Sequence, residues 1–370
     1  MPGRIYLQIP GPTNIPESVL TAMHRPAINH RGGEFAELLR SITDGLQRLM
    51  QTKNDVLIFP GSGSGGLEAA VVNVLSPGDK VVAVNMGVFS DRFGVIARSF
   101  GAEVTTIEVE WGKAVTAEQL RQVLVEDKDH AYKAVLITHN ETATGVTTDL
   151  ASIRAMLDEL NHPALFMVDA VSSLVINDLS MDELKIDVLV AASQKGLMLP
   201  GGLAIVAVSE KAWAAHKTST MPKWYWNFTA VKNRSAIGQM PYTPAISLFF
   251  GLRESLRLIE EEGLSNVIAR HASNADAVRR GVQELGLELL VREPKEQSNA
   301  VTAVMLPEGV AYEDLARAME DMGVVIGGGL QRLEGKVFRI GHLGMLHMAD
   351  VEVILGVLRD ALKNAGIRYH

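Results

Sequence analysis

The sequence predicts an α/β fold: a large domain with a mostly parallel seven-stranded sheet flanked by helices, followed by a smaller C-terminal α+β domain. The first observation is that seven short apolar runs alternate with segments of helical periodicity between residues 55 and 208. The second is that these runs are continuously apolar, as expected for strands that helices cover on both faces. The expected strands are Asp55–Phe59, Lys80–Asn85, Glu103–Val109, Lys133–Thr138, Ala164–Val168, Asp187–Ala192 and Leu203–Val208.

The rest of the chain of 370 residues divides around this pattern. An amphipathic helix over 34–50 opens the large domain, and a long helix follows Pro244. The aromatic segment 221–242 shows no periodicity, so we expect it to be irregular. The predicted parts are an N-terminal arm rich in proline and glycine (1–33), the large domain (34–245), a linking helix (246–263) and the small domain (264–370).

Composition excludes several classes of protein. The net charge is −8 and no basic patch stands out, so nucleic acid is not an expected partner. No apolar run reaches the roughly 18 residues that a membrane span needs. The chain has no cysteine, which rules out disulfides, thiolate metal sites and a cysteine nucleophile. We assign no metal ligands. The ends of the chain show no signal-peptide or lipidation pattern, and together these features favour the cytoplasm.

Lys195 stands in an unusual place for a lysine. It follows the apolar run Asp187–Ala192 and precedes the glycine-bearing stretch 196–202. A solvated lysine normally lies on a helix face or in a polar loop, so we expect this amine to be partly desolvated. Desolvation lowers the pKa of an ammonium group and frees the amine as a nucleophile. The hypothesis is a Schiff base between Lys195 and a carbonyl cofactor; taken alone, a structural ion pair is nearly as good an explanation.

The stretch Gly61–Gly66 follows one predicted strand and opens a predicted helix. Backbone N–H groups at a helix N-terminus bind phosphate, and the hydroxyls of Ser62 and Ser64 add donors. The letters also match the dinucleotide pattern, but that site needs an acidic residue at the end of the next strand, which here ends in Asn85. A plain turn, a dinucleotide site and a site for a phosphorylated cofactor remain open, and we favour the third.

Asp169 follows the apolar run Ala164–Val168. An isolated buried carboxylate is costly, so it needs a partner. A protonated pyridine nitrogen is one such partner, and the pair keeps the ring an electron sink. An aspartate that caps a turn or a helix is the alternative. The combination of the glycine–serine loop, Asp169 and Lys195 in that order is more specific than any of them alone, because together they can bind a phosphate, a pyridine ring and an aldehyde.

With these motifs the sequence resembles the class V, fold-type I pyridoxal phosphate-dependent aminotransferases, and within them the alanine–glyoxylate and serine–glyoxylate (serine–pyruvate) branch. The resemblance covers nearly the whole chain. It implies the type I transferase fold, pyridoxal 5'-phosphate as cofactor and a homodimer with shared active sites. The segments that carry it are Pro10–Thr13, Gly61–Ser64 with Leu67–Ala69, His139–Gly145, Val168–Asp169, Ser193–Lys195, Tyr242–Leu248 with Leu252–Leu256, and Phe338–Gly341.

The resemblance also implies a role for each residue that contacts the cofactor. Lys195 carries the cofactor and then moves a proton between the substrate Cα and the cofactor C4′. Asp169 binds the pyridine N–H. The other implied contacts are Ser62, Gly63, Ser64 and Gln194 at the phosphate, Phe89 stacked on the ring, Thr142 at the phenolic oxygen, and Tyr242 and Thr243 reaching the phosphate of the partner subunit.

For the substrate, the resemblance implies that Arg339 binds the carboxylate through its planar guanidinium, with a backbone N–H of Gly11 beside it. A solvated position on an edge strand is the alternative for Arg339. Purely structural roles are the alternatives for four of the cofactor contacts. They are core packing for Phe89, a turn for Thr142, and core or turn positions for Tyr242 and Thr243.

Two segments have no single assignment. His30 and Arg31 suit the substrate entrance and a structural arm equally well. Residues 224–228, which include Trp224, Tyr225, Trp226 and Phe228, suit a substrate wall or a dimer contact. Their aromatic composition favours the dimer contact.

The predicted reaction is a ping-pong transamination. Alanine or serine donates its amino group to the cofactor, and a 2-oxo acid such as glyoxylate or pyruvate accepts it. Aspartate or ureidoglycine as donor is the alternative within the family. A nucleotide-binding protein and a non-catalytic partner subunit are the alternatives outside it, and Asn85 together with the Lys195–Asp169 combination argues against the former. The absence of cysteine removes a thiol-dependent desulfurase.

Overall fold

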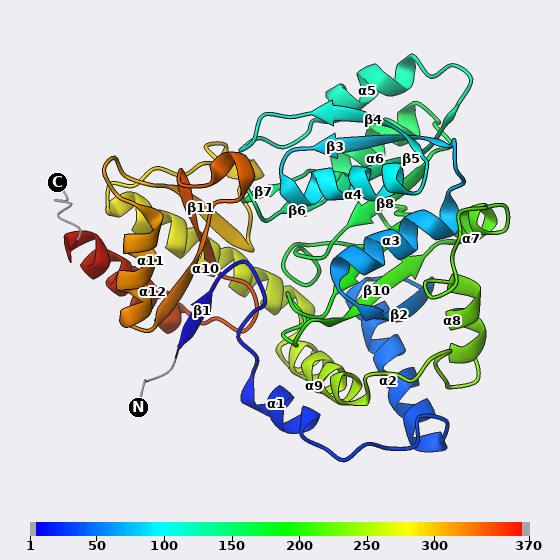
Figure 1. Ribbon diagram of the computed structural model, residues 1–370, viewed down its shortest axis with the longest axis horizontal. Helices are drawn as coiled ribbons and strands as arrows, with labels where there is room; N and C mark the ends of the chain where they lie inside the picture. The colour runs from blue at the N-terminus through cyan, green and yellow to red at the C-terminus, as the bar shows by residue number, and fades with distance from the viewer. Residues whose placement is uncertain (1–4, 365–370) are drawn as a thin grey trace.

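A seven-stranded sheet forms the centre of the larger lobe in Figure 1, which shows the computed structural model. The structure describes residues 5–364. All strand pairs are parallel except the two that β10 makes with β2 and β9. The prediction of a mostly parallel seven-stranded sheet is confirmed. In spatial order the strands are β2 (Asp55–Gly61), β10 (Gly202–Val208), β9 (Val188–Ala192), β8 (Leu165–Asp169), β5 (Tyr132–Thr138), β3 (Lys80–Asn85) and β4 (Glu103–Glu108).

Residues 1–4 and 365–370 lie outside the described residues. They include the ends of the predicted arm and of the predicted small domain. The prediction that the chain shows no targeting signals also concerns these residues. None of the helices within 5–364 is both long and apolar enough to cross a bilayer.

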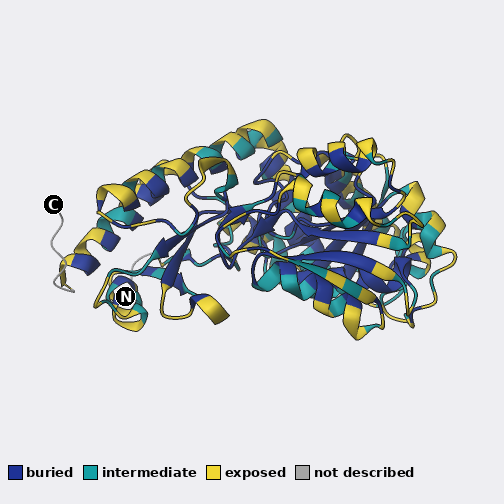
Figure 2. Ribbon diagram, turned by 90° about the horizontal axis from the view of Figure 1, so that it is seen from above, coloured by how far each residue is buried: buried dark blue, intermediate teal, exposed yellow. Residues whose placement is uncertain are grey.

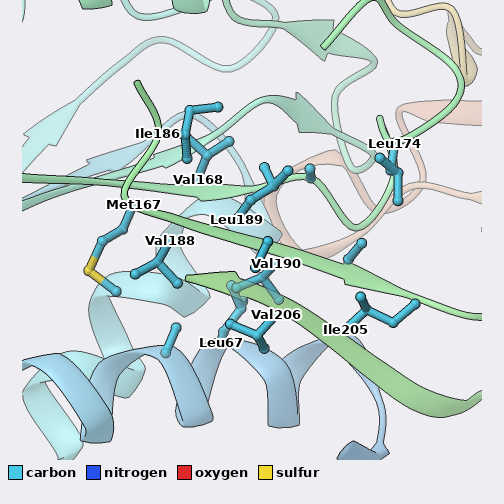
Figure 3. Packing of buried hydrophobic residues seen from close by; sticks show 14 of the residues in the cluster. Leu67, Met167, Val168, Leu174, Ile186, Val188, Leu189, Val190, Ile205 and Val206 are labelled. Carbon is cyan, nitrogen blue, oxygen red and sulfur yellow. The ribbon is translucent and has the colours of Figure 1, made fainter. Parts of the chain in front are cut away.

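Helix α3 (Gly63–Val74) lies directly on the sheet. A Cβ on Gly66 would lie 2.8 Å from Val190 Cγ1 of β9 and 3.2 Å from Ala204 Cβ of β10. No side chain separates the helix from the strands at this point, and Figure 3 shows Leu67 reaching the same apolar layer beside Val190. The close approach fixes the N-terminus of α3 at the edge of the sheet where β9 ends.

Other helices cover the rest of the sheet. Helix α4 (Val88–Ser99) follows β3 and packs on β3, β4 and β5 as well as on α3. In Figure 2 the dark blue strands lie between helices whose outer faces are yellow. This burial on both faces explains why the inner strands are continuously apolar, whereas the edge strand β4 alternates exposed and half-buried residues over most of its length. The remaining helices of this lobe are α2 (Gly33–Leu49), α5 (Ala117–Val125), α6 (Leu150–Glu159), α7 (Glu210–His216) and α8 (Phe228–Ser235).

Helix α8 corrects two predictions. The segment 221–242 was expected to be irregular, but Phe228–Ser235 is helical. The side chain of Asn227 accepts a hydrogen bond from the N–H of Ala230, a standard helix start that the aromatic composition of the segment masks. Phe228 is fully buried beside Phe59, so its assignment to a substrate wall or a dimer contact is wrong.

The long helix α9 (Ile246–Glu262) packs against α1 (Glu17–Met23) and α2, and it continues into α10 (Leu264–Glu284). Gly263 separates the two helices with a φ of 86°, a left-handed conformation that glycine adopts at little cost. The helix expected over 246–263 is therefore present, and a glycine ends it.

A four-stranded sheet forms the smaller lobe, whose prediction as an α+β unit is confirmed. Its apolar core is a separate cluster that includes Phe338 and Ile354. β1 comes from the predicted N-terminal arm and pairs in parallel with β12, so the arm is partly built into this lobe. The elements, in sheet order and then chain order, are β1 (Tyr6–Gln8), β12 (Val324–Gly328), β13 (Val337–Gly341), β11 (Val301–Met305), α11 (Tyr312–Asp321) and α12 (Met348–Asn364).

Short elements connect the lobes. The two-stranded sheet of β6 (Asn140–Glu141) and β7 (Val146–Thr147) follows β5, and Val146 also bridges to Gln297 after the 3₁₀ turn η1 (Pro294–Glu296). A second 3₁₀ turn, η2 (Gln331–Leu333), precedes β13. The residue boundaries proposed for the domains remain a prediction.

The contact of α3 with the sheet can be tested with a pair of glycine substitutions. Overpacking costs about 1–3 kcal/mol, whereas replacing a helical glycine by alanine returns at most about 1 kcal/mol. Gly66→Ala should therefore lower the free energy of unfolding in urea. Gly356→Ala in α12 is the matched control, because a Cβ there meets no atom within 4 Å, and it should raise that free energy. Equal gains in both variants would contradict the packing argument.

Candidate active site

A cavity of about 320 Å³ lies where the parallel strands of the large sheet end. Ligands of open α/β sheets bind at this edge. Nine of the residues predicted from the sequence line it, whereas Arg339, Tyr242 and Thr243 do not. The lining is Gly11, Pro12, Ser62, Gly63, Ser64, Leu67, Phe89, Arg92, Asn140, Thr142, Asp169, Val171, Ser172, Gln194 and Lys195.

Lys195 reaches the cavity from the turn after β9. Its Nζ donates a hydrogen bond to the carbonyl of Pro10. Burial lowers the pKa of the amine to about 8, and the positive charge of Arg339 acts in the same direction, while Asp169 opposes it. At pH 7 roughly a tenth of such an amine is neutral and nucleophilic, far more than for an ordinary lysine.

Gly11 makes room for this lysine. Its φ is +120°, and a Cβ at this position would lie 2.5 Å from Lys195 Nζ. Thr13, two residues later, binds the turn that contains Gln194 and Lys195. Its backbone N–H donates to the Gln194 carbonyl at 3.3 Å, and its hydroxyl donates to the Lys195 carbonyl at 3.3 Å. The N-terminal segment thus forms one wall of the cavity.

Asp169 is the last residue of β8 and is buried in the cavity wall. Its Oδ1 accepts the N–H of Val171 at 2.9 Å. Among residues 5–364, no hydrogen bond or ion pair engages its Oδ2. Burial raises the pKa of this carboxyl to about 7, with the carboxylate of Glu141 contributing in the same direction. A cationic N–H donor in the cavity would satisfy Oδ2 and stabilise the ionised form.

The N-terminus of α3 forms the other end of the cavity. Ser62 is its N-cap residue, and its side chain makes no capping hydrogen bond. The hydroxyl of Ser64 accepts a hydrogen bond from Arg92 Nη1 at 2.9 Å. Gly63 lies so close to Val171 that a Cβ would be 2.7 Å from its Cγ2. Backbone N–H groups, two hydroxyls and a guanidinium therefore converge here, as a phosphate requires.

Arg92 is a cavity residue that the sequence reasoning missed. It follows Phe89 by three residues on α4, and its Cζ lies 4.9 Å from the centre of the Phe89 ring. The spacing of Phe89 and Arg92 could have indicated this contact, because residues three apart share a helix face and arginine favours aromatic faces. Asn140, Val171 and Ser172 were also missed, although each lies within three residues of a predicted one.

Arg339 lies on β13 of the small lobe and is buried. Its Nε donates to the Gly328 carbonyl at 2.7 Å, and its Nη1 donates to the Thr142 carbonyl at 2.9 Å. Because Thr142 lines the cavity, this bond holds the guanidinium beside it. Burial lowers the pKa of Arg339. The solvated edge position considered from the sequence is therefore wrong.

The remaining predicted residues do not line the Lys195 cavity of this chain. Tyr242 stacks on Tyr225 with ring centres 4.5 Å apart, and its hydroxyl donates to the Trp224 carbonyl. Trp224 itself is 77% exposed. Thr243 lines a different, small cavity with Tyr242. Arg31 donates to Gln239 Oε1 on the surface, and neither it nor His30 lines the cavity.

Comparison with known proteins identifies the family. The family model described as aminotransferase class-V matches residues 5–345. The chain belongs to the class-V aminotransferases. This family membership confirms the resemblance inferred from the motifs.

Named relatives match over nearly the full length of the chain. The L-aspartate–glyoxylate aminotransferase of Paracoccus denitrificans is 44% identical over 94% of this chain and 88% of its own. The serine–glyoxylate aminotransferase of Hyphomicrobium methylovorum is 43% identical over 98% of this chain and 90% of its own. The crystal structure of alanine–glyoxylate aminotransferase from Nostoc sp. superposes with a TM-score of 0.92 at 30% identity, covering 98% and 96% of the two chains.

Class-V aminotransferases use pyridoxal phosphate, and the residues of the cavity fit that cofactor. Lys195 offers an amine with a lowered pKa, and Asp169 offers an unengaged carboxylate oxygen. The start of α3 offers donors for a phosphate, and Gly63 lets it pack closely against Val171. The amine, the carboxylate and the phosphate donors line one cavity, and its volume suits a small cofactor.

The buried state of Asp169 predicts a pH dependence of stability. With no cofactor bound, its pKa is about 7 in the folded chain against an ordinary 3.8. Between pH about 4 and 7 the folded chain holds more protons than the unfolded chain, so the free energy of unfolding falls as pH rises. Asp169→Asn should flatten this slope in urea titrations of cofactor-free protein. Asp44→Asn on the exposed surface of α2 is the control, and wild-type and Asp169→Asn curves that stay parallel would refute the shift.

Proposed function

We propose that the protein transfers the amino group of a small amino acid, alanine or serine, to a 2-oxo acid such as glyoxylate or pyruvate, with pyridoxal phosphate as cofactor. The observation that carries the proposal is the convergence of Lys195, Asp169 and the N-terminus of α3 on one cavity, with Arg339 beside it. The relatives named for serine, alanine and aspartate with glyoxylate support it.

Lys195, Asp169 and the start of α3 have distinct tasks in this proposal. Bound pyridoxal phosphate supplies an aldehyde that condenses with amines and a pyridine ring that withdraws electrons. Lys195 Nζ holds the cofactor and, when free, takes the proton from the substrate Cα as a general base. Asp169 Oδ2 accepts the ring N–H. Ser62, Ser64 and the first N–H groups of α3 bind the phosphate.

The substrate carboxylate is proposed to bind Arg339. Within the described part of the chain no hydrogen bond uses its Nη2, whereas Nε and Nη1 are held by the carbonyls of Gly328 and Thr142. The N–H groups of Nη2 are therefore left to donate to a carboxylate, the group that a guanidinium binds best. The backbone N–H of Gly11 lies at the same cavity and is proposed as a further donor.

A homodimer with shared active sites is part of the proposal. Tyr242 and Thr243 lie outside the Lys195 cavity of their own chain, and Trp224 exposes a large aromatic surface next to Tyr242. Exposed aromatic side chains are enriched at interfaces. Both residues are proposed to reach the phosphate bound to the partner subunit.

Sedimentation velocity should give the mass of two chains, and a monomer at active concentrations would refute the proposed homodimer. A cytoplasmic location also remains a prediction.

The donor can be identified by half-reactions. Purified protein with bound cofactor is mixed with alanine, serine, aspartate or ureidoglycine in turn, and loss of the visible absorbance band is recorded. We expect the fastest conversion with alanine or serine. Aspartate is the second candidate, favoured by the name of the Paracoccus relative. Lys195→Ala should abolish turnover with every donor, because no other amine lines the cavity among the described residues. Full activity in this variant would refute the proposal.

Arg339→Lys should raise KM for the amino acid and for the 2-oxo acid. A lysine cannot form the bidentate contact or keep both carbonyl bonds, and losing charged hydrogen bonds of this kind weakens binding about ten- to a hundredfold. Steady-state kinetics with both substrates provides the measurement. Arg317→Lys on α11, where the side chain is 73% exposed, is the control. An unchanged KM in Arg339→Lys would assign the carboxylate to another group.

A further inference from the structure

Glu141 is a buried carboxylate that none of the roles above uses. It lies on β6 next to Thr142, and its exposed fraction is 0%. No ion pair within residues 5–364 engages it. Burial raises the pKa of this carboxyl, which marks the cost of keeping it away from water. A buried carboxylate of this kind is tolerated only when hydrogen bonds compensate it.

Three backbone N–H groups supply that compensation. Glu141 Oε2 accepts from the N–H of Phe89 at 2.9 Å and from the N–H of Ser90 at 2.7 Å. Its Oε1 accepts from the N–H of Ala143 at 2.8 Å. The first two donors belong to the first turn of α4, whose N–H groups have no partner within the helix and lie at its positive end.

Gly87, the N-cap residue of α4, is shaped to the same carboxylate. A Cβ on Gly87 would overlap the Glu141 side chain. The hydroxyl of Ser90 braces this turn, because it accepts the N–H of Met86 and donates to the carbonyl of Gly87. The start of α4 is therefore fitted around the carboxylate rather than merely close to it.

The residues that Glu141 connects line the cavity from two different elements. Phe89 begins one wall from α4, and Thr142 begins another from the segment after β5. Thr142 in turn holds Arg339 through its carbonyl. The negative charge of Glu141 also acts on Lys195, Asp169 and Arg339, so it lies within electrostatic reach of these three groups.

We propose that Glu141 is a positioning residue: it fixes the separation between Phe89 and Thr142, and so the orientation of the cofactor ring between them. The inference rests on the proposed function, because it assumes that pyridoxal phosphate occupies this cavity. Glu141 touches neither cofactor nor substrate in this scheme and acts through the two residues that it joins.

The test compares Glu141→Gln with wild type as full-length holoenzymes. An amide of the same shape keeps one acceptor oxygen but cannot serve three N–H donors. Dialysis against graded pyridoxal phosphate should show cofactor affinity about ten- to a hundredfold lower, the range for loss of one charged hydrogen bond. At saturating cofactor, the visible circular dichroism of the bound ring should change in intensity, which a general loss of stability would not cause. Glu108→Gln is the matched control, since that carboxylate binds Asn85 at the end of β3 outside the cavity.

Gly87→Ala provides a second, independent variant. It keeps the carboxylate but displaces it from α4, so it should lower affinity and alter the circular dichroism in the same direction. This variant decides the question if Glu141→Gln does not fold. Wild-type affinity and circular dichroism in a folded Glu141→Gln or Gly87→Ala variant would overturn the positioning role. If wild type itself binds no pyridoxal phosphate, the proposed function fails, which is a distinguishable result.

Discussion

The contact between the N-terminal segment and the lysine turn is the interaction on which the cavity depends. Pro10, Gly11 and Thr13 lie against Gln194 and Lys195 through three hydrogen bonds and one close approach. The same segment begins with β1 in the small sheet, so the two lobes meet at the lysine. Residues far apart in the chain thus enclose an amine that would otherwise point into solvent.

Burial has opposite effects on the ionisable groups gathered there. It lowers the pKa of Lys195 to about 8 and raises that of Asp169 to about 7, so both groups can change protonation near neutral pH. Glu141 and Arg339 are buried as well, and within residues 5–364 backbone groups rather than ion pairs hold them. Peptide dipoles therefore offset part of the cost of burying these two side chains.

The sequence allowed much of the fold and the cavity lining to be predicted, for a physical reason. Lys195, Asp169 and Ser62 each follow an apolar strand, and the ends of parallel strands meet at one edge. The contacts that could not be predicted depend on packing between segments that are distant in the chain. Neither the contact of Glu141 with the first turn of α4 nor the bond from Arg92 to Ser64 follows from local pattern. Helix α8 was missed because its cap, Asn227, lies among aromatic residues.

The bond from Arg339 to the Thr142 carbonyl has a consequence for which molecules can bind. An arginine side chain free in solution loses much rotational freedom when it grips a ligand, and that loss weakens binding. Here the loss is incurred during folding, since two carbonyls already immobilise the guanidinium. A two-carbon acid offers almost no apolar surface to compensate such a loss. In its proposed role, a rigid arginine of this kind would hold so small a ligand by its carboxylate alone.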